Sequence, residues 1–203
     1  MKDKSYIIGE CNNTEINFST QKLSSSNFLT TNYGMKLQGA SSKGLNQLSL
    51  RIGDVAKWFL SKSSMSNKKL QKLCYYAYCW YIVFFNDVEA ITDNNENDIL
   101  VLCQERFQAW VHGPVLPSLY KTYKDYGWQN IPKEEHTPLF INEINDLLQQ
   151  VWEAYGDFSA YELEALTHQE TPWIKARKCI PSGEACSNEI SPYDILQYYS
   201  SLE

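Results

Sequence analysis

Apolar residues recur at helical spacing along most of the chain after residue 49. In the first such stretch, 52–60, they fall at i, i+3, i+4, i+7 and i+8, which predicts an amphipathic helix. A polar break at Ser61–Ser64 ends this helix, and Ser66 follows as the predicted N-cap of the next one. That helix has an apolar stripe from Leu70 to Phe84 and tyrosines on its other faces. We therefore expect it to be buried on most sides and to be the central helix.

Shorter helices are predicted for the second half of the chain. Glycine closes two of them, at Gly127 and Gly156. A capping-box pattern opens another, because Ser159 is followed three residues later by Glu162. Proline in the first turn opens the last two. The predicted helices run from Leu116 to Tyr126, from Leu139 to Tyr155, from Ser159 to about Thr167, from Thr171 to about Lys178, and from Ser191 to about Leu202.

One stretch between the helices has the alternation of a β-strand. Ile99–Leu102 and Glu105–Val111 alternate apolar and polar residues, and His112–Gly113–Pro114 is expected to end the strand. The preceding Asp93–Asp98 is predicted to be a solvated loop. The whole pattern predicts a mainly α fold, namely a compact helical domain with a small antiparallel β element of two or three strands.

Residues 1–48 differ from the rest of the chain. Ser, Thr, Asn, Gln and Gly make up 24 of these 48 residues, and no helical or strand period persists. This composition predicts a polar, low-complexity N-terminal extension that is flexible or forms short strands. The domain itself is expected to span 49–203.

Charge and aromatic content narrow the possible functions. The 203 residues include 18 Lys and Arg against 24 Asp and Glu, a net charge of −6. Residues 1–48 carry 5 basic and 3 acidic residues (+2), which leaves 13 and 21 (−8) for 49–203. An acidic body argues against nucleic acid as a partner. Aromatic residues make up 14% of the chain, which favours a packed body over a disordered one.

Neither a targeting segment nor a membrane span is evident. The first residues lack the apolar run of a signal peptide, and no stretch approaches about 18 uninterrupted apolar residues. We therefore expect a cytoplasmic protein with no membrane partner. The six cysteines are then expected to be reduced and mostly packed.

The common catalytic and metal-binding motifs are absent, including HExxH, Walker A, GxGxxG, G-x-S-x-G and CxxC. A zinc site from His168, Cys179 and Cys186 is conceivable, but it lacks a fourth ligand and the usual paired spacing. A Cys–His pair could form only across the fold. No catalytic residue, metal or cofactor is therefore predicted.

Two polar segments nevertheless stand out. The first, 109–117, is expected to form a rigid corner that holds Trp110 and His112 at defined angles, beside Gly113 and Pro114. Trp110 is then either a core wedge at a helix start, which we favour, or part of a recognition corner.

The second segment, 166–173, joins the end of one predicted helix to a helix opened by proline. Thr167, His168 and Glu170 lie where helix ends leave backbone groups without partners, and their side chains can cap these groups. Trp173 follows in the first turn of the second helix. A structural role is favoured for this segment as well.

Four blocks, taken in order, resemble the Panacea domain family, the SocA-like antitoxins that are also described as phage-associated GepA-like proteins. They are DVAKWFL at 54–60, NKKLQKLCYYAYCWY at 67–81, FQAWVHGPVLP at 107–117 and LEALTHQETPWIKAR at 163–177. Each block alone is weak, but AW-x-x-GPV-x-P between KLQKL-x-YYA and LTH-x-E-x-PW is specific. The resemblance covers about residues 50–200.

This resemblance implies an antitoxin of a two-gene toxin–antitoxin system that is often carried on phages and mobile elements. It would neutralise a cognate protein toxin, encoded by a neighbouring gene, through direct binding, and a cellular protease would be a second partner for its turnover. The matching residues are candidates either for toxin contact or for holding the family fold. They are Trp110, His112, Gly113, Pro114, Thr167, His168, Glu170 and Trp173.

Two alternatives remain. One is a small hydrolase-type enzyme with His112 or His168 as general base. The other is a regulatory protein of a phage or mobile element. Residues 1–48 show no helix-turn-helix pattern, and the acidic body also argues against DNA binding.

Overall fold

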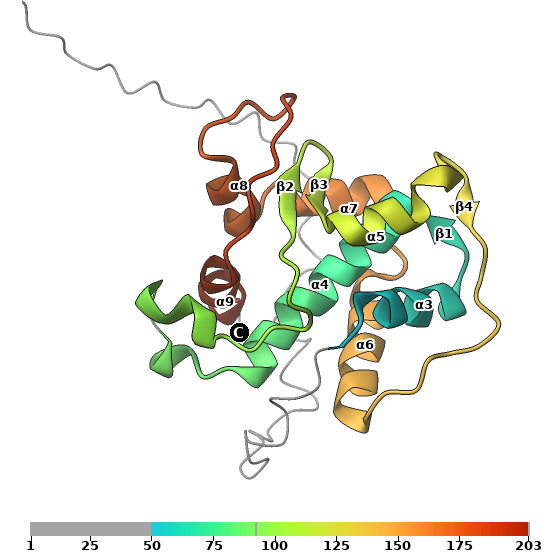
Figure 1. The fold of residues 1–203 in the computed structure, drawn as a ribbon, viewed down its shortest axis with the longest axis horizontal. Coiled ribbons are helices and arrows are strands. Elements are labelled where there is room, and N and C mark those ends of the chain that lie inside the picture. The colour runs from blue at the N-terminus through green and yellow to red at the C-terminus, as the bar shows by residue number, and fades with distance from the viewer. Residues whose placement is uncertain (1–49, 92, 203) are drawn as a thin grey trace, which may run out of the picture.

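A computed structural model describes residues 50–91 and 93–202, so the predictions for 1–48 lie outside the described residues. One long helix, α4 (Asn67–Phe85), runs through the middle, and the other elements are arranged around it (Figure 1). The other helices are α3 (Ile52–Lys62), α5 (Pro117–Tyr123), α6 (Asn142–Tyr155), α7 (Ala160–Thr167), α8 (Thr171–Arg177) and α9 (Pro192–Ser200), with short 3₁₀ turns η2 (Val88–Ala90), η3 (Asp93–Asp98) and η4 (Lys124–Tyr126). The prediction of a mainly helical domain is confirmed.

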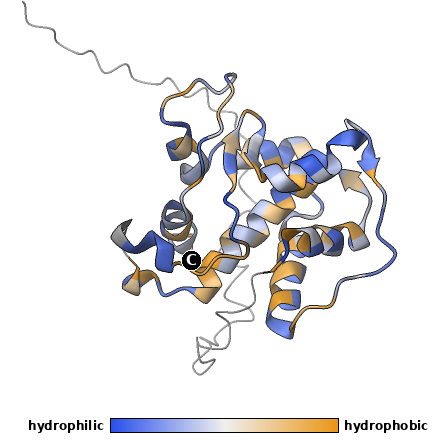
Figure 2. Cartoon of the chain, in the orientation of Figure 1, coloured by the Kyte–Doolittle hydropathy of each residue, from blue (hydrophilic) through white to orange (hydrophobic). Residues whose placement is uncertain are grey.

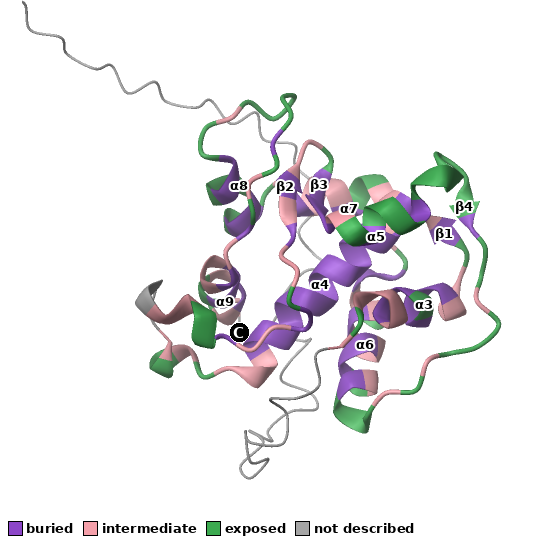
Figure 3. Ribbon diagram, viewed as in Figure 1, coloured by how far each residue is buried: buried purple, intermediate pink, exposed green. Residues whose placement is uncertain are grey.

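Helix α4 is the buried axis of the domain, as predicted. It begins at Ser66, whose hydroxyl accepts a hydrogen bond from the Lys69 amide (3.3 Å). All of its residues are buried except two lysines near its start and two phenylalanines at its end, and Figure 3 shows this burial along almost its whole length. Polar side chains on such a helix must find their partners inside the protein.

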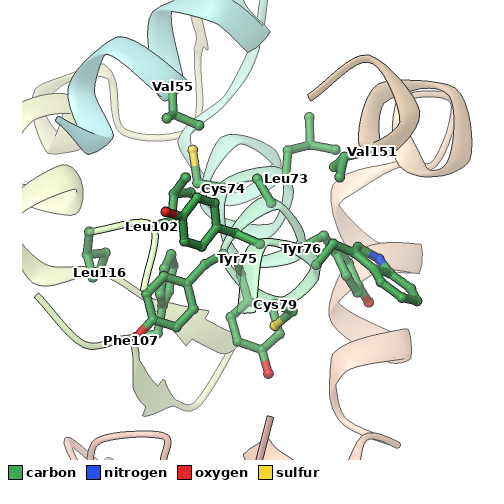
Figure 4. Close-up of a cluster of buried hydrophobic side chains, with 14 of the residues drawn as sticks. Val55, Leu73, Cys74, Tyr75, Tyr76, Cys79, Leu102, Phe107, Leu116 and Val151 are labelled. Atoms are coloured by element: carbon green, nitrogen blue, oxygen red, sulfur yellow. The ribbon is translucent and has the colours of Figure 1, made fainter. Parts of the chain in front are cut away.

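The core around α4 is aromatic to an unusual degree. The ring of Tyr75 meets Phe107 edge-on at 5.4 Å, and the ring of Tyr76 stacks on Tyr155 at 3.9 Å. Side chains from α3, from α6 and from the segments before β2 and α5 converge on this helix (Figure 4). Much of α4 has pale colours in Figure 2, because tyrosine and tryptophan have intermediate hydropathy. Its burial therefore depends on ring packing more than on aliphatic side chains.

The β structure consists of two small antiparallel sheets. Strand β2 (Gln108–Trp110) pairs with β3 (Gly113–Val115), and β1 (Met65–Ser66) pairs with β4 (Asn130–Ile131). The expectation that His112–Gly113–Pro114 ends the strand is wrong, because Gly113 and Pro114 belong to the second arm of a hairpin. Pro114 has no amide to donate, and it is tolerated opposite Ala109 because the Ala109 carbonyl accepts from the Arg177 guanidinium (3.0 Å) and needs no donor from β3.

The predicted strand at Ile99–Leu102 is also wrong. The Asn86 side chain bonds both the amide and the carbonyl of Leu100 (2.8 and 2.9 Å), so these backbone groups have no need of a neighbouring strand. The predicted loop at Asp93–Asp98 contains the 3₁₀ turn η3. Helix α6 begins at Asn142 instead of Leu139, whose side chain is 96% exposed.

Ser159 is the N-cap of α7, and its side chain stabilises the start of this helix. The Ser159 hydroxyl accepts from the Glu162 amide (3.2 Å), while the Glu162 carboxylate accepts from the Ser159 amide (2.7 Å), which confirms the predicted capping box. Replacing Ser159 with alanine should lower the free energy of unfolding by about 1 kcal/mol, measured by urea denaturation. Ser182→Ala, at an exposed serine whose side chain makes no described hydrogen bond, is the matched control. Equal losses in the two variants would contradict the capping assignment.

Candidate functional site

The two polar segments singled out by the sequence meet in space beside the first half of α4. The indole Nε1 of Trp173, on α8, donates to the Trp110 carbonyl of the hairpin (3.1 Å). One residue earlier in the hairpin, the Ala109 carbonyl accepts from the buried guanidinium of Arg177 (3.0 Å). Figure 1 shows the hairpin and α7–α8 gathered around this part of α4. The family blocks thus form one packed unit.

Gly113 lies where the hairpin, α4 and α7 approach one another most closely. Its φ is +89°, and a Cβ there would lie 2.6 Å from the Cε atom of Lys72 and 2.7 Å from the hydroxyl of Thr167. The Lys72 ammonium donates to the Pro114 carbonyl (3.1 Å), and the Thr167 hydroxyl donates to the Glu164 carbonyl (2.9 Å). Only glycine satisfies both the backbone angle and the space.

Lys72 is a buried cation on an otherwise mostly apolar helix. Its side chain belongs to a residue that is 1% exposed. Burial lowers the pKa of Lys72 to about 7; the charge of Glu164 opposes this shift and that of Lys68 adds to it. The buried group therefore loses its proton far more readily than an exposed lysine does.

Glu164 holds two basic side chains at the protein surface. One carboxylate oxygen lies 2.6 Å from the Lys68 ammonium, and the other lies 2.8 Å from Nδ1 of His112. Burial alone would raise the pKa of Glu164, but the hydrogen bonds from Lys68 and His112 outweigh it and hold that pKa below its ordinary value. The His112 side chain stays 68% exposed, so its ring is positioned yet accessible.

Glu170 points into the core, and the expectation that it caps a helix is wrong. Although it is the N-cap residue of α8, its side chain makes no capping bond. It accepts hydrogen bonds from the hydroxyls of Tyr76 (2.9 Å) and Tyr199 (2.8 Å) instead. Burial raises the pKa of Glu170 to about 7, against the opposing effect of these two hydrogen bonds. The carboxyl group thereby ties α8 to α4 and α9.

His168 has a different environment from the one its position suggested. Its ring stacks on the Trp173 indole at 4.1 Å, and burial lowers the pKa of His168. It does not cap a backbone group, so that expectation is wrong for His168 as well. Thr167 is the member of the segment whose side chain does bond a helix carbonyl.

A cavity of about 810 Å³ opens between the hairpin, the start of α4 and the α5–η4 segment. Its lining includes Lys68, Lys72, Trp110, His112, Tyr120 and Lys124. Trp110 is half-buried, with its indole Nε1 donating to Gln108 (2.8 Å) and its ring edge-on to Tyr120 at 5.1 Å. It forms part of the cavity wall, so the favoured expectation of a core wedge is wrong. Of the eight predicted site residues, only Trp110 and His112 line this cavity.

Several residues that build the site were not predicted. Lys72, Glu164 and Arg177 lay inside the recognised blocks, but they were not singled out as site residues. A lysine inside the helix that is predicted to be buried on most sides is a signal that could have found Lys72. No local pattern identifies Tyr199 as a partner of Glu170, because 29 residues separate them.

The structure does not assemble the conceivable zinc site. Within residues 50–91 and 93–202, no group of three or more His, Cys, Asp or Glu side chains could hold a metal ion. The five described cysteines are free, and four of them are buried. Cys11 lies outside the described residues.

Fold and cavity together define a small helical domain that is built on one buried helix and carries a cation-lined cavity beside a β-hairpin. Residues 70–174 match the family model described as antitoxin SocA-like, Panacea domain, and the chain belongs to this family. No curated protein and no solved structure matches the chain.

Family membership supports an antitoxin-type role, and such a role implies a toxin as partner and favours a function other than catalysis. No helix within the described part of the chain has both the length and the apolar character to span a bilayer.

Proposed function

We propose that the protein is the antitoxin of a two-gene system and that it neutralises a protein toxin, encoded by the neighbouring gene, by binding it directly. The match of residues 70–174 to the antitoxin family carries this proposal. The toxin is held in an inactive complex, and degradation of the antitoxin by a cellular protease releases it. The setting we propose is the cytoplasm, with the gene pair on a phage or mobile element.

Exposed aromatic side chains support binding to a protein. Trp128 is 89% exposed and Tyr161 is 76% exposed, and Tyr120 is also exposed. Tryptophan and tyrosine supply much of the binding energy in protein interfaces. The acidic body, with 21 acidic against 13 basic residues in 49–203, would speed the encounter with a basic toxin.

The eight candidate residues divide by accessibility. Trp110 and His112 reach the cavity and can touch a partner. Five others are buried, and His168 is half-buried against Trp173, so we assign these six to holding the hairpin and the α7–α8 corner in place. The buried five are Gly113, Pro114, Thr167, Glu170 and Trp173.

The hydrolase alternative has one specific feature in its favour, the His112–Glu164 pair at 2.8 Å. A carboxylate that orients an accessible imidazole is an arrangement general bases use. His112→Ala separates the two functions: an enzyme loses turnover by roughly 100-fold or more, whereas a binder loses at most part of its affinity. The regulatory alternative requires salt-sensitive operator binding, which the acidic body disfavours.

The domain boundary is part of the proposal. We place the antitoxin domain at 49–203 and assign the first 48 residues to an extension that orders on the toxin, as polar segments of this composition can. Deletion of this extension should then weaken toxin binding without unfolding the domain.

Co-expression tests the proposed function. Inducing the neighbouring gene alone should stop growth, and inducing it together with this protein should restore colony counts by roughly a thousandfold, because a complex with nanomolar Kd leaves little toxin free. An affinity-tagged copy should recover the toxin as a stoichiometric complex. Growth arrest that persists despite normal expression of this protein, together with no recovered complex, would contradict the proposal.

A further inference from the structure

The cavity beside the hairpin is basic, although the domain around it is acidic. The described residues that line it include three lysines and a histidine, Lys68, Lys72, Lys124 and His112, and no aspartate or glutamate. Residues 49–203 carry 21 acidic against 13 basic side chains, so this clustering runs against the composition. A cavity lined in this way favours an anionic ligand.

Lys72 is the basic lining residue that is almost fully buried. The residue is 1% exposed, and among the described residues its ammonium has one hydrogen-bond acceptor, the Pro114 carbonyl at 3.1 Å. Within the described residues, no carboxylate lies at ion-pair distance from it, and Glu164 is already bound to Lys68 and His112. A buried amine with one neutral acceptor either loses its proton or is stabilised in its charged form by an anion.

The rest of the lining indicates what kind of molecule carries the anionic group. Trp110 and Tyr120 form an aromatic wall, and the exposed Lys124 stands on the same helical segment as Tyr120. A volume of about 810 Å³ is far larger than a single ion and has room for a side chain with flanking residues. The extension at 1–48 is a poor occupant, because its net charge is +2.

We propose that this cavity receives an acidic segment of the toxin, in which an aspartate or glutamate carboxylate pairs with Lys72 and Lys124 and a neighbouring apolar side chain packs on Trp110 and Tyr120. This inference rests on the proposed function and specifies its contact surface. The acidic exterior of the domain attracts the basic parts of the toxin, and the cavity fixes how the toxin is oriented.

Proton uptake is a direct signature of this contact. In the free protein the pKa of Lys72 is about 7. The other titratable groups around the Lys72 side chain are Lys68, His112, His168, Lys124 and Glu164. A carboxylate that pairs with Lys72 raises its pKa, so the complex takes up a proton on part of the molecules at neutral to mildly alkaline pH. For the same reason, affinity should fall roughly 50-fold between about pH 7 and pH 9.

Calorimetry with purified toxin, inactivated at its own active site, measures both effects. Titrations in buffers of different ionisation enthalpy give the proton uptake, which Lys72→Met should abolish. Lys124→Glu should raise the Kd by roughly 10- to 100-fold, because it places like charges together. Lys121→Glu makes the same charge change three residues away, outside the cavity lining, and should leave the Kd within about twofold.

The outcomes separate this inference from the proposed function. Charge reversal of one toxin Asp or Glu that restores binding to the Lys124→Glu variant would establish the contact. Toxin that binds with unchanged affinity and proton uptake in both the Lys72 and Lys124 variants would overturn the inference while leaving the antitoxin function intact. Binding of ATP or inorganic pyrophosphate that depends on Lys72 but does not compete with toxin would also overturn it.

Discussion

Replacing Gly113 with alanine should lower the free energy of unfolding by about 2–5 kcal/mol, the largest loss we expect from a single methyl group in this protein. The backbone at φ +89° strains any L-residue with a side chain. The added Cβ also overlaps Lys72 at 2.6 Å and Thr167 at 2.7 Å, and both of these neighbours are buried. Urea denaturation at neutral pH measures the loss.

Gly127→Ala separates the two causes. Gly127 also has positive φ (+56°), but a Cβ there meets nothing within 4 Å, so this variant carries backbone strain alone, about 1–2 kcal/mol. The additional loss in the free energy of unfolding at Gly113 then measures the steric overlap of the new Cβ with Lys72 and Thr167. Similar losses at both glycines would show that the hairpin can move away, and that Lys72 and Thr167 do not fix its position.

Local sequence patterns predicted the helices well because helix signals are short in range. The burial of α4, its N-cap at Ser66 and the capping box at Ser159 all follow from residues within one or two turns. The strands were harder to predict. The expected strand at 99–102 failed because a side chain 14 residues earlier, Asn86, bonds Leu100.

The sequence predicts where the site lies, but it does not predict which side chains contact one another there. The sequence blocks pointed to Trp110, His112 and the 167–173 segment, and the structure packs these together. The chain position of Glu170 predicts a cap, because it lies where a helix end leaves backbone groups without partners. Its true partners, Tyr76 and Tyr199, lie 94 and 29 residues away. Such contacts depend on tertiary packing, which periodicity and spacing do not encode.

Two of the buried ionisable groups, Glu170 and Lys72, should give the domain a stability minimum near neutral pH. The pKa of Glu170 is raised to about 7 in the folded protein, so its contribution is fully present below the unfolded value near 4.5 and is lost as the pH rises through 7. This change amounts to about 3 kcal/mol at most. Lys72 acts in the opposite sense. Its folded pKa is lowered to about 7, so stability is regained as the pH rises above 7.

Two variants show which group causes the slope on each side of the minimum, when the free energy of unfolding is plotted against pH. Glu170→Gln keeps polar atoms for both tyrosine hydroxyls and should flatten the curve between about pH 4.5 and 7. Lys72→Met should flatten it between about pH 7 and 9. Above that range the buried thiols of Cys74 and Cys79, whose pKa values burial raises well above normal, oppose Lys72.

The lowered pKa of His168 opposes Glu170 over part of the acidic arm, so the difference between wild type and variant is the quantity to measure. Urea unfolding across this pH range provides it. A minimum that persists unchanged in both variants would show that neither group carries its charge change in the folded domain. A minimum that is lost on its acidic side in one variant and on its alkaline side in the other would establish that Glu170 and Lys72 set the pH at which the domain is least stable.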